Sequence, residues 1–311
     1  ILEEDLSSFL YSKYPGLTET ELEKAINKIK HISTYPLYSS NRQAFFLINE
    51  GFDLSRDNNN EMPLHIDFID FEAPTNNIFK VINQITISGT RDRRPDMIIF
   101  INGIPVVIFE FKTAIKEDTT IYDAWEQIHM RYNRDIPNLT KYCFLSVLSD
   151  GANTKMGSIF TPYEYYYSWN KANEDEKVSN GISALLTMIK GAFSKGSLIS
   201  ILRDFIYYPD DESKELAIVT RYPQYFAANK MLENIKAHLK PKGDGKGGTY
   251  FGATGSGKTY AMLFLSRMLA THYRDVFDAP TIIVIVDRDD LNKQTSKLFE
   301  DSKQFLKDKK V

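Results

Sequence analysis

A glycine-rich segment at residues 252–259 sharply narrows the folds open to this 311-residue chain. The segment matches the pattern G-x-x-x-x-G-K-[ST], whose glycines let successive backbone N–H groups converge on a polyphosphate. A strand is predicted before it at 249–251 and a helix after it at 258–270, and the N-terminus of a helix favours a bound anion. The pattern therefore predicts an α/β nucleotide-binding domain, with a glycine-rich turn that carries an exposed lysine as the alternative.

Side chains in and around this segment are expected to hold ATP and Mg²⁺. Lys258 supplies a cation for the β and γ phosphates, and Thr259 supplies a hydroxyl for Mg²⁺. Gln224 lies upstream, where a helix is predicted at 223–239; its amide could pair with the edge of adenine, although a surface glutamine at a helix start is the alternative. The other residues assigned to the nucleotide are Gly252, Thr254, Gly255, Ser256 and Gly257. Downstream, an apolar segment at 281–286 is predicted to form a fully buried parallel strand.

A second pattern, Asp96 followed by Glu110-x-Lys112, matches PD-(D/E)-x-K. It lies in a predicted hairpin of strands at 96–101 and 104–112. Glu110 and Lys112 are two residues apart in one strand, so their side chains point to the same face. Asp96 and Glu110 offer a hard-oxygen site for Mg²⁺, and the Lys112 ammonium can stabilise charge that develops on a phosphate. A salt-bridged pair of strands is the alternative.

The turn of this hairpin decides whether the two acids can share a cation. A two-residue turn at Asn102 and Gly103 pairs Asp96 with Phe109 and places Glu110 on the opposite face of the sheet. The acids share a face only if the hairpin contains a β-bulge, or a three-residue loop with Gly103 in the left-handed conformation. We therefore predict one of these two irregularities.

Periodicity predicts the elements around the hairpin. A helix at 18–31 should begin with a capping box of Thr18 and Glu21. In a further helix at 121–134, Gln127 lies off the apolar side and could reach a metal-bound water or DNA, with an exposed glutamine as the alternative. A helix is also expected at 41–49, strands near 64–71, 78–88 and 142–148, and helices at 181–190 and 197–207.

Composition excludes several classes of protein. No apolar run approaches the roughly 18 residues that a membrane span needs. The single cysteine, Cys143, excludes an internal disulfide framework and a multi-cysteine zinc site, and it favours a reducing, cytoplasmic setting. The net charge is −3, so any contact with phosphates is expected from local patches rather than from the overall charge.

The order of these motifs resembles the amino-terminal part of the motor/restriction (R) subunit of type I restriction endonucleases. The resemblance implies an α/β architecture: a RecB-like PD-(D/E)xK restriction-endonuclease-like domain at 1–175, a helical connector at 176–214, and the first part of a RecA-like P-loop domain of superfamily 2 helicases at 215–311. It rests on Asp96…Glu110-x-Lys112, Gln-Ile-His-Met-Arg-Tyr at 127–132, residues 198–207, Arg-Tyr-Pro-Gln at 221–224, the segment 252–259 and Val-Asp-Arg at 286–288.

The same resemblance implies an activity and partners. These are ATP-dependent translocation and non-specific, Mg²⁺-dependent cleavage of double-stranded DNA, in a complex with methylation and specificity subunits. Because no DEAD/DEAH-type motif is present in the chain, it is expected to bind ATP but to hydrolyse it poorly. The family's Q-x-x-x-Y motif has one extra residue between Gln127 and Tyr132, which takes Tyr132 out of the expected spacing. A supporting glutamate is expected at Glu23.

Two other classes of protein remain open at this point. One is a different nuclease–helicase fusion, such as a type III-like enzyme or a recombination nuclease. The other is a degenerate nuclease fold that only binds DNA and is attached to an ATPase. Substitution of Asp96, Lys112 or Lys258 distinguishes these classes.

Overall fold

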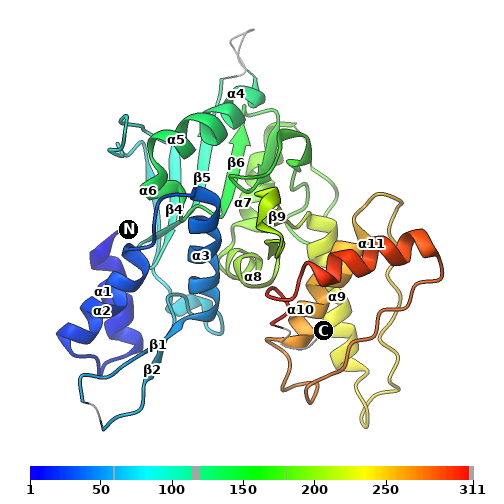
Figure 1. Ribbon diagram of the computed structural model, residues 1–311. Helices are drawn as coiled ribbons and strands as arrows, with labels where there is room; N and C mark the ends of the chain where they lie inside the picture. Colours follow the sequence, from blue (N-terminus) through cyan, green and yellow to red (C-terminus); the bar gives the residue numbers. More distant parts are fainter. Residues whose placement is uncertain (59, 114–119, 180, 308–311) are drawn as a thin grey trace. The chain divides into compact units, whose positions relative to one another are not determined.

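The computed structural model describes residues 1–58, 60–113, 120–179 and 181–307, and Figure 1 traces the chain. The chain splits into two compact units. The first comprises Ile1–Asn170 and Ser179–Arg203, and the second comprises Lys171–Val178 and Asp204–Val311. The segment expected as a connector, 176–214, is therefore divided between the two units, and its helices lie almost wholly in the first.

A five-stranded mixed sheet forms the centre of the first unit, in the order β3-β4-β5-β6-β7. Neighbouring strands are antiparallel except β5 and β6, which run parallel. A parallel pair needs a long crossover connection, and here that crossover carries the helices that follow the Glu110-x-Lys112 motif. The strands are β3 (Phe79–Asn83), β4 (Met97–Ile101), β5 (Ile104–Phe111), β6 (Leu145–Ser149) and β7 (Thr154–Gly157).

The β4–β5 hairpin contains the predicted bulge. Its turn has only two residues, but the register shifts between Ile99 and Phe100. Extending the shifted register by one residue beyond Met97 places Asp96 opposite Glu110. Residues directly opposite each other on paired strands share a face of the sheet. The predicted irregularity is therefore confirmed as a bulge, and it puts the two acids on one face.

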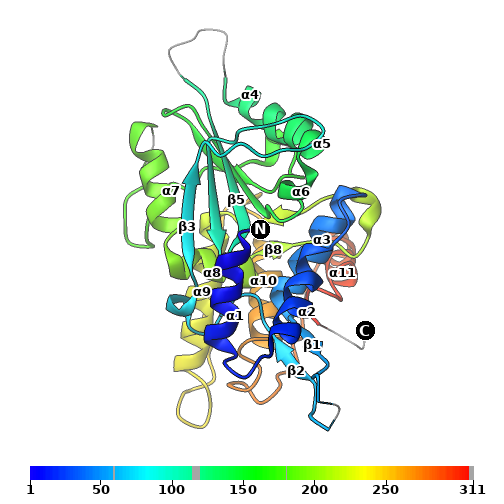
Figure 2. The ribbon, with the colours of Figure 1, turned by 90° about the vertical axis from the view of Figure 1, so that its left-hand side faces the viewer.

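Helices cover both faces of this sheet, as Figure 2 shows. On one face, Ile108 and Leu148 are buried against Ile128 and other apolar residues of the crossover. On the other face, the ring centroids of Phe109 and Phe193 lie 5.3 Å apart. The crossover consists of α4 (Ile121–Glu126), the π-helix η2 (Gln127–Tyr132), α5 (Asn133–Asp135) and α6 (Pro137–Thr140), and the opposite face carries α7 (Ala184–Ala192) and α8 (Lys195–Asp204).

Substitution of Gly103 by alanine is expected to destabilise the first unit by about 2 kcal/mol or more. Gly103 has a φ of +78°, and a Cβ atom there would lie 2.1 Å from the carbonyl oxygen of Leu2. Both tryptophans, Trp125 and Trp169, lie in this unit, so urea unfolding followed by tryptophan fluorescence measures the loss. Gly151→Ala is the control, because Gly151 also has a positive φ but open space around it. Equal losses in the two variants would show that the overlap with Leu2 contributes nothing.

Three helices and a short hairpin precede the sheet. The predicted capping box is present: Thr18 Oγ1 accepts the N–H of Glu21 at 3.1 Å, and a Glu21 carboxylate oxygen accepts the N–H of Thr18 at 3.1 Å. The helix at 3–13 adds to the predicted elements, and the one predicted at 41–49 begins four residues earlier. These elements are α1 (Glu3–Lys13), α2 (Glu19–Lys30), α3 (Leu37–Glu50), β1 (Phe52–Leu54) and β2 (Leu64–Ile66).

Three longer helices dominate the second unit: α9 (Tyr222–Ala237), α10 (Lys258–Ala270) and α11 (Asp289–Glu300). The strands expected at 249–251 and 281–286 are not formed. Residues 281–286 form no strand and are mostly exposed, and Ile285 is 88% exposed, so the expectation of a buried parallel strand is wrong. A parallel strand is stable only between paired neighbours, and among the described residues of this unit the paired strands are β8 (Ile206–Tyr207) and β9 (Ile218–Val219).

Short 3₁₀-helices complete the described elements, at Pro74–Asn76, Tyr163–Tyr165, Gly181–Ser183 and Glu212–Lys214. Taken singly, none of the described helices has the length and apolar character to cross a membrane. The pair Gly181–Ala192 and Lys195–Asp204 meets that test only jointly, across a bend of 71°.

Candidate functional site

Asp96 and Glu110 meet at the end of the β4–β5 hairpin. Glu110 is the seventh residue of β5 and is only 3% exposed. Asp96 directly precedes β4, and its Oδ2 atom accepts the backbone N–H of Phe111 at 2.8 Å. The Oδ1 atom of Asp96 accepts a bond from the side-chain amide of Gln84 at 3.2 Å. The bulged register and these bonds hold two carboxylates side by side, as the sequence predicts.

Lys112 joins Glu110 to the crossover helix. Its Nζ atom donates to Oε1 of Glu110 at 2.9 Å and to Oε1 of Gln127 at 2.7 Å. The Lys112 side chain is 15% exposed, so the ammonium group is largely enclosed by these partners. The structure therefore brings Gln127 into contact with Lys112 of the Glu110-x-Lys112 motif, rather than leaving it exposed on an amphipathic helix.

Tyr132 closes the same network, although its spacing in the sequence argued against this. Its hydroxyl accepts a bond from Nε2 of Gln127 at 2.6 Å and donates to Oε2 of Glu110 at 2.9 Å. In an α-helix, residues five apart differ by about 140° around the axis. Residues 127–132 instead form a π-helix, whose hydrogen bonds link residues five apart and bring them to one side. The local π-helix thus absorbs the extra residue, and its five-residue spacing was the signal in the sequence.

Burial sets the ionisation of this cluster. Burial raises the pKa of Glu110, and the nearby Asp96 carboxylate acts in the same direction, whereas the bonds from Lys112 and Tyr132 oppose it. Burial and the neighbouring Glu110 also raise the pKa of Tyr132, so its hydroxyl keeps its proton and can donate to Glu110. A cation beside the two acids would favour the ionised form of Glu110.

The donor set fits Mg²⁺. Among the described residues, no group of three or more His, Cys, Asp or Glu side chains is placed to hold a metal. Mg²⁺ does not need such a cage, because it usually retains several waters and binds through one or two carboxylates. Asp96 and Glu110 provide two, and in Glu110 both oxygens are buried beside a single lysine and a tyrosine hydroxyl. These are the residues that could hold the ion.

The structure does not support Glu23 as a further ligand. Glu23 is exposed on α2, and it makes no hydrogen bond or ion pair with Asp96 or Glu110 in the described part of the chain. Its neighbour Glu21 is buried, but it caps α2 and binds Arg56 at 2.8 Å. The hydrophobic spacing of α2 turns residues 22, 26 and 29 inward, which leaves Glu23 on the solvent side.

The glycine-rich segment forms a turn that leads into α10. Gly255 and Gly257 both have a φ of +78°, a conformation that glycine adopts without strain. Lys258 is exposed, and its Nζ atom donates to the carbonyl oxygens of Gly252 at 2.7 Å and Ala253 at 3.1 Å. A bound phosphate would compete with these two carbonyls for the ammonium group.

The remaining predicted nucleotide residues follow the same turn. Thr259 lies in the first turn of α10 and Thr254 is exposed. The hydroxyl of Ser256 is buried without a hydrogen-bond partner in the described structure, so an additional ligand could engage it.

Gln224 lies against this turn and is 4% exposed, so the alternative of a surface glutamine is wrong. Its Nε2 atom donates to the carbonyl oxygens of Ser256 and Gly257, both at 3.2 Å, and its Oε1 atom accepts the N–H of Arg221 at 2.9 Å. A Cβ atom on Gly257 would lie 2.2 Å from Nε2 of Gln224. The amide thus supports the backbone of the glycine-rich turn, and pairing with adenine would require it to exchange these partners.

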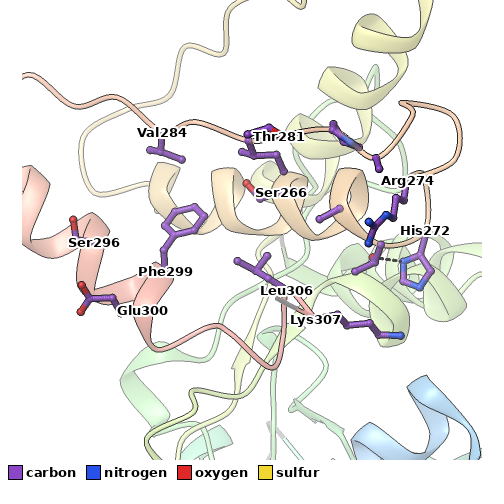
Figure 3. A pocket seen from close by; sticks show the side chains of 15 residues that line it. Ser266, His272, Arg274, Thr281, Val284, Ser296, Phe299, Glu300, Leu306 and Lys307 are labelled. Carbon is purple, nitrogen blue, oxygen red and sulfur yellow. Dashed lines mark hydrogen bonds between the residues drawn. The ribbon is translucent and has the colours of Figure 1, made fainter. Parts of the chain in front are cut away.

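A separate cavity of about 880 Å³ lies elsewhere in the second unit. Figure 3 shows its walls, which include Ser266 of α10, Thr281 and Val284 of the unpaired segment, and Phe299 of α11. None of residues 252–259 lines this cavity. It is therefore distinct from the candidate nucleotide site.

Family models of known proteins match segments of both units. A family model described as type I restriction enzyme R protein N terminus matches residues 1–165, which is more than half of the chain and contains the whole Asp96–Tyr132 network. The chain belongs to this family. A second model, described as SWI2/SNF2 ATPase, matches residues 223–310 and contains the glycine-rich turn.

Curated relatives agree with the family assignment. The HindI endonuclease subunit of a type I restriction enzyme from Haemophilus influenzae is 27% identical over 299 residues, covering 94% of this chain and 28% of the relative. The putative MjaIXP endonuclease subunit from Methanocaldococcus jannaschii is 31% identical over 311 residues, covering 92% and 29%. A Staphylococcus aureus subunit is 24% identical over 288 residues, covering 91% and 28%. The chain thus spans less than a third of the length of these relatives.

Proposed function

We propose that this chain supplies the DNA-cleaving site and an ATP-binding segment of a type I restriction enzyme, which translocates and cuts double-stranded DNA. The observation that carries the proposal is the closed network of Asp96, Glu110, Lys112, Gln127 and Tyr132. Hydrogen bonds of 2.6–2.9 Å join Glu110, Lys112, Gln127 and Tyr132 across the hairpin and the π-helix. Asp96 lies opposite Glu110 in the bulged register and accepts the N–H of Phe111 at 2.8 Å. A merely structural salt bridge would not require the bulge that aligns the two acids or the π-helix that aligns Gln127 with Tyr132.

In this proposal each side chain has a defined part. Asp96 and Glu110 would hold Mg²⁺, which when bound would polarise a phosphodiester and lower the pKa of a water molecule. The Lys112 ammonium stabilises negative charge that develops on the phosphate. Gln127 orients that ammonium through its carbonyl oxygen, and Tyr132 fixes Glu110 through its hydroxyl. These two are positioning residues.

The architecture supports a finer assignment. We propose that the first unit is a RecB-like PD-(D/E)xK domain, since its motif lies on a bulged hairpin whose second strand pairs in parallel with β6. The second unit is proposed as the beginning of a RecA-like domain, in which Lys258 and Thr259 bind ATP and Mg²⁺. The partners proposed from the family are double-stranded DNA and the methylation and specificity subunits.

Membership of this family argues against a type III-like enzyme and against a recombination nuclease. The remaining competitor is a degenerate nuclease fold that binds DNA without cutting it. That reading does not require a divalent ion between Asp96 and Glu110. Binding of Mg²⁺ to the first unit therefore separates the two.

At a pH above about 7, Mg²⁺ should raise the temperature at which half of the first unit is unfolded. This rise in the midpoint should become smaller as the pH falls. Burial favours protonated Glu110, whereas Mg²⁺ needs the carboxylate; without metal, ionisation of Glu110 therefore costs stability as the pH rises. Because the pKa of Glu110 is raised, the stabilisation by Mg²⁺ should disappear at a pH that is still above the ordinary glutamate pKa of about 4.3. Tryptophan fluorescence during heating measures it, with Asp96→Asn as the variant that loses it. A gain that is independent of pH, or that persists in Asp96→Asn, contradicts the assignment.

A further inference from the structure

Aromatic side chains and a lysine from α4, β7 and the 3₁₀-helix Tyr163–Tyr165 gather beside the network of Glu110 and Lys112. Tyr122 and Trp125 of α4 stack with ring centroids 5.4 Å apart, and Trp125 stacks on His129 at 4.5 Å. Tyr163 meets Tyr122 edge-on at 5.0 Å, and Nζ of Lys155 lies 4.8 Å above the Tyr163 ring. We call Tyr122, Trp125, Tyr163 and Lys155 the aromatic–lysine patch.

Strand register fixes the distance between this patch and the candidate cleavage site. Glu110 pairs with Leu148 on β6, and Leu148 pairs with Lys155 on β7. The three residues therefore form one row across the sheet and share the face that carries α4. Adjacent strands lie about 4.8 Å apart, so the Cα atoms of Lys155 and Glu110 are separated by about 10 Å. That distance equals about three base steps of B-DNA at 3.4 Å each.

The charge of Lys155 is available to an anion. Lys155 makes no ion pair with any acid among the described residues, unlike Lys112, which pairs with Glu110 at 2.9 Å. The acid in the adjacent turn, Asp150, accepts the N–H groups of Ala152 at 2.9 Å and Asn153 at 2.6 Å. The ring face of Tyr163 attracts the Lys155 ammonium and holds it in place beside the sheet.

Packing within the protein explains the position of some aromatic rings of the patch, but not of all of them. Trp125 is anchored, because its Nε1–H donates to the carbonyl oxygen of Thr161 at 3.0 Å. Tyr122 is 43% exposed, although it stacks at the end of the row. Tyr122 contacts Tyr163, and the Lys155 ammonium lies over that second ring. Proteins bind unpaired nucleotides with aromatic rings and cations placed together in this way, through stacking and phosphate contact.

We propose that the aromatic–lysine patch binds the DNA strand beside the scissile phosphate. Lys155 contacts a phosphate within about three nucleotides of the cleavage point, and Tyr122 stacks on a base that is unpaired there. The proposal rests on the nuclease function proposed above, and it adds a requirement for local strand opening at the cut.

Binding of an oligothymidylate to the chain, in Ca²⁺ rather than Mg²⁺, tests this proposal. Trp169 is only 1% exposed, so quenching of tryptophan fluorescence reports Trp125. The wild-type chain should show quenching. Lys155→Gln should weaken binding about 5- to 10-fold and lower the slope of log K against log salt by about 0.7, the value for one phosphate contact on a single strand. Tyr122→Leu, which keeps an apolar side chain, should reduce the quenching and the affinity.

Two further variants separate this proposal from the nuclease assignment. Lys190→Gln removes an exposed lysine of α7 and should bind like the wild type. Lys112→Gln should lose cleavage but retain oligothymidylate binding. If Lys155→Gln and Tyr122→Leu both bind with the affinity and salt slope of the wild type, the proposed role of the patch is wrong, while the nuclease assignment stands. If the wild-type chain does not bind oligothymidylate, the proposed role of the patch is also wrong.

Discussion

Cleavage of double-stranded DNA should fall at least about 100-fold when Lys112 is replaced by alanine. The structure gives the reason: the Lys112 ammonium bonds Glu110, one of the two acids, at 2.9 Å and Gln127 at 2.7 Å. Its loss removes the positive charge that pairs with one of the two proposed metal ligands. The measurement is the rate of cleavage by an R subunit that contains this chain, assembled with its methylation and specificity subunits, while ATP hydrolysis is followed in parallel.

Two control variants sharpen this prediction. Lys112→Gln keeps a donor for Glu110 but removes the charge, so it should fold normally and lose nearly as much cleavage as Lys112→Ala. Lys190→Ala removes a surface lysine of α7 and should cut normally. ATP hydrolysis should be retained in all three variants. Wild-type cleavage in both Lys112 variants would reduce the first unit to a DNA-binding module.

Binding of ATP should weaken at least about tenfold when Lys258 is replaced by alanine. The lysine is exposed, and its Nζ atom donates to the carbonyl oxygens of Gly252 and Ala253 within the glycine-rich turn. It is therefore positioned to move onto a phosphate. Titration of the chain with a fluorescent ATP analogue measures the loss.

Lys246→Ala is the matched control for this variant. Lys246 is exposed in the loop that precedes the turn, so its removal changes the net charge equally. It should bind ATP like the wild type. Equal losses in the two variants would indicate a general effect of charge, and no loss in Lys258→Ala would remove the nucleotide site from this turn.

The hairpin could be predicted from the sequence because chemistry restricted its geometry. Asp96 and Glu110 can share a cation only with an irregular register, so the need for a common face predicted the bulge that occurs between Ile99 and Phe100. The capping box of Thr18 was predictable for a similar reason, since it depends on two residues at a fixed local spacing.

Other features depend on information that local patterns do not carry. Tyr132 escaped prediction because α-helical spacing was assumed where the chain forms a π-helix. The apolar segment at 281–286 has the composition of a buried strand, but a strand forms only with paired neighbours. Gln224 was assigned to adenine from its amide chemistry alone, whereas its contacts with Ser256 and Gly257 follow from the tertiary fold.

Calorimetric titration of the chain with Mn²⁺, in the absence of nucleotide, measures directly whether Asp96 and Glu110 share a metal ion. The account predicts one ion bound to the first unit of the wild-type chain. It predicts that Asp96→Asn and Glu110→Gln each abolish this binding, whereas Lys258→Ala leaves it unchanged. Binding of one ion with unaltered affinity in both carboxylate variants would contradict the account.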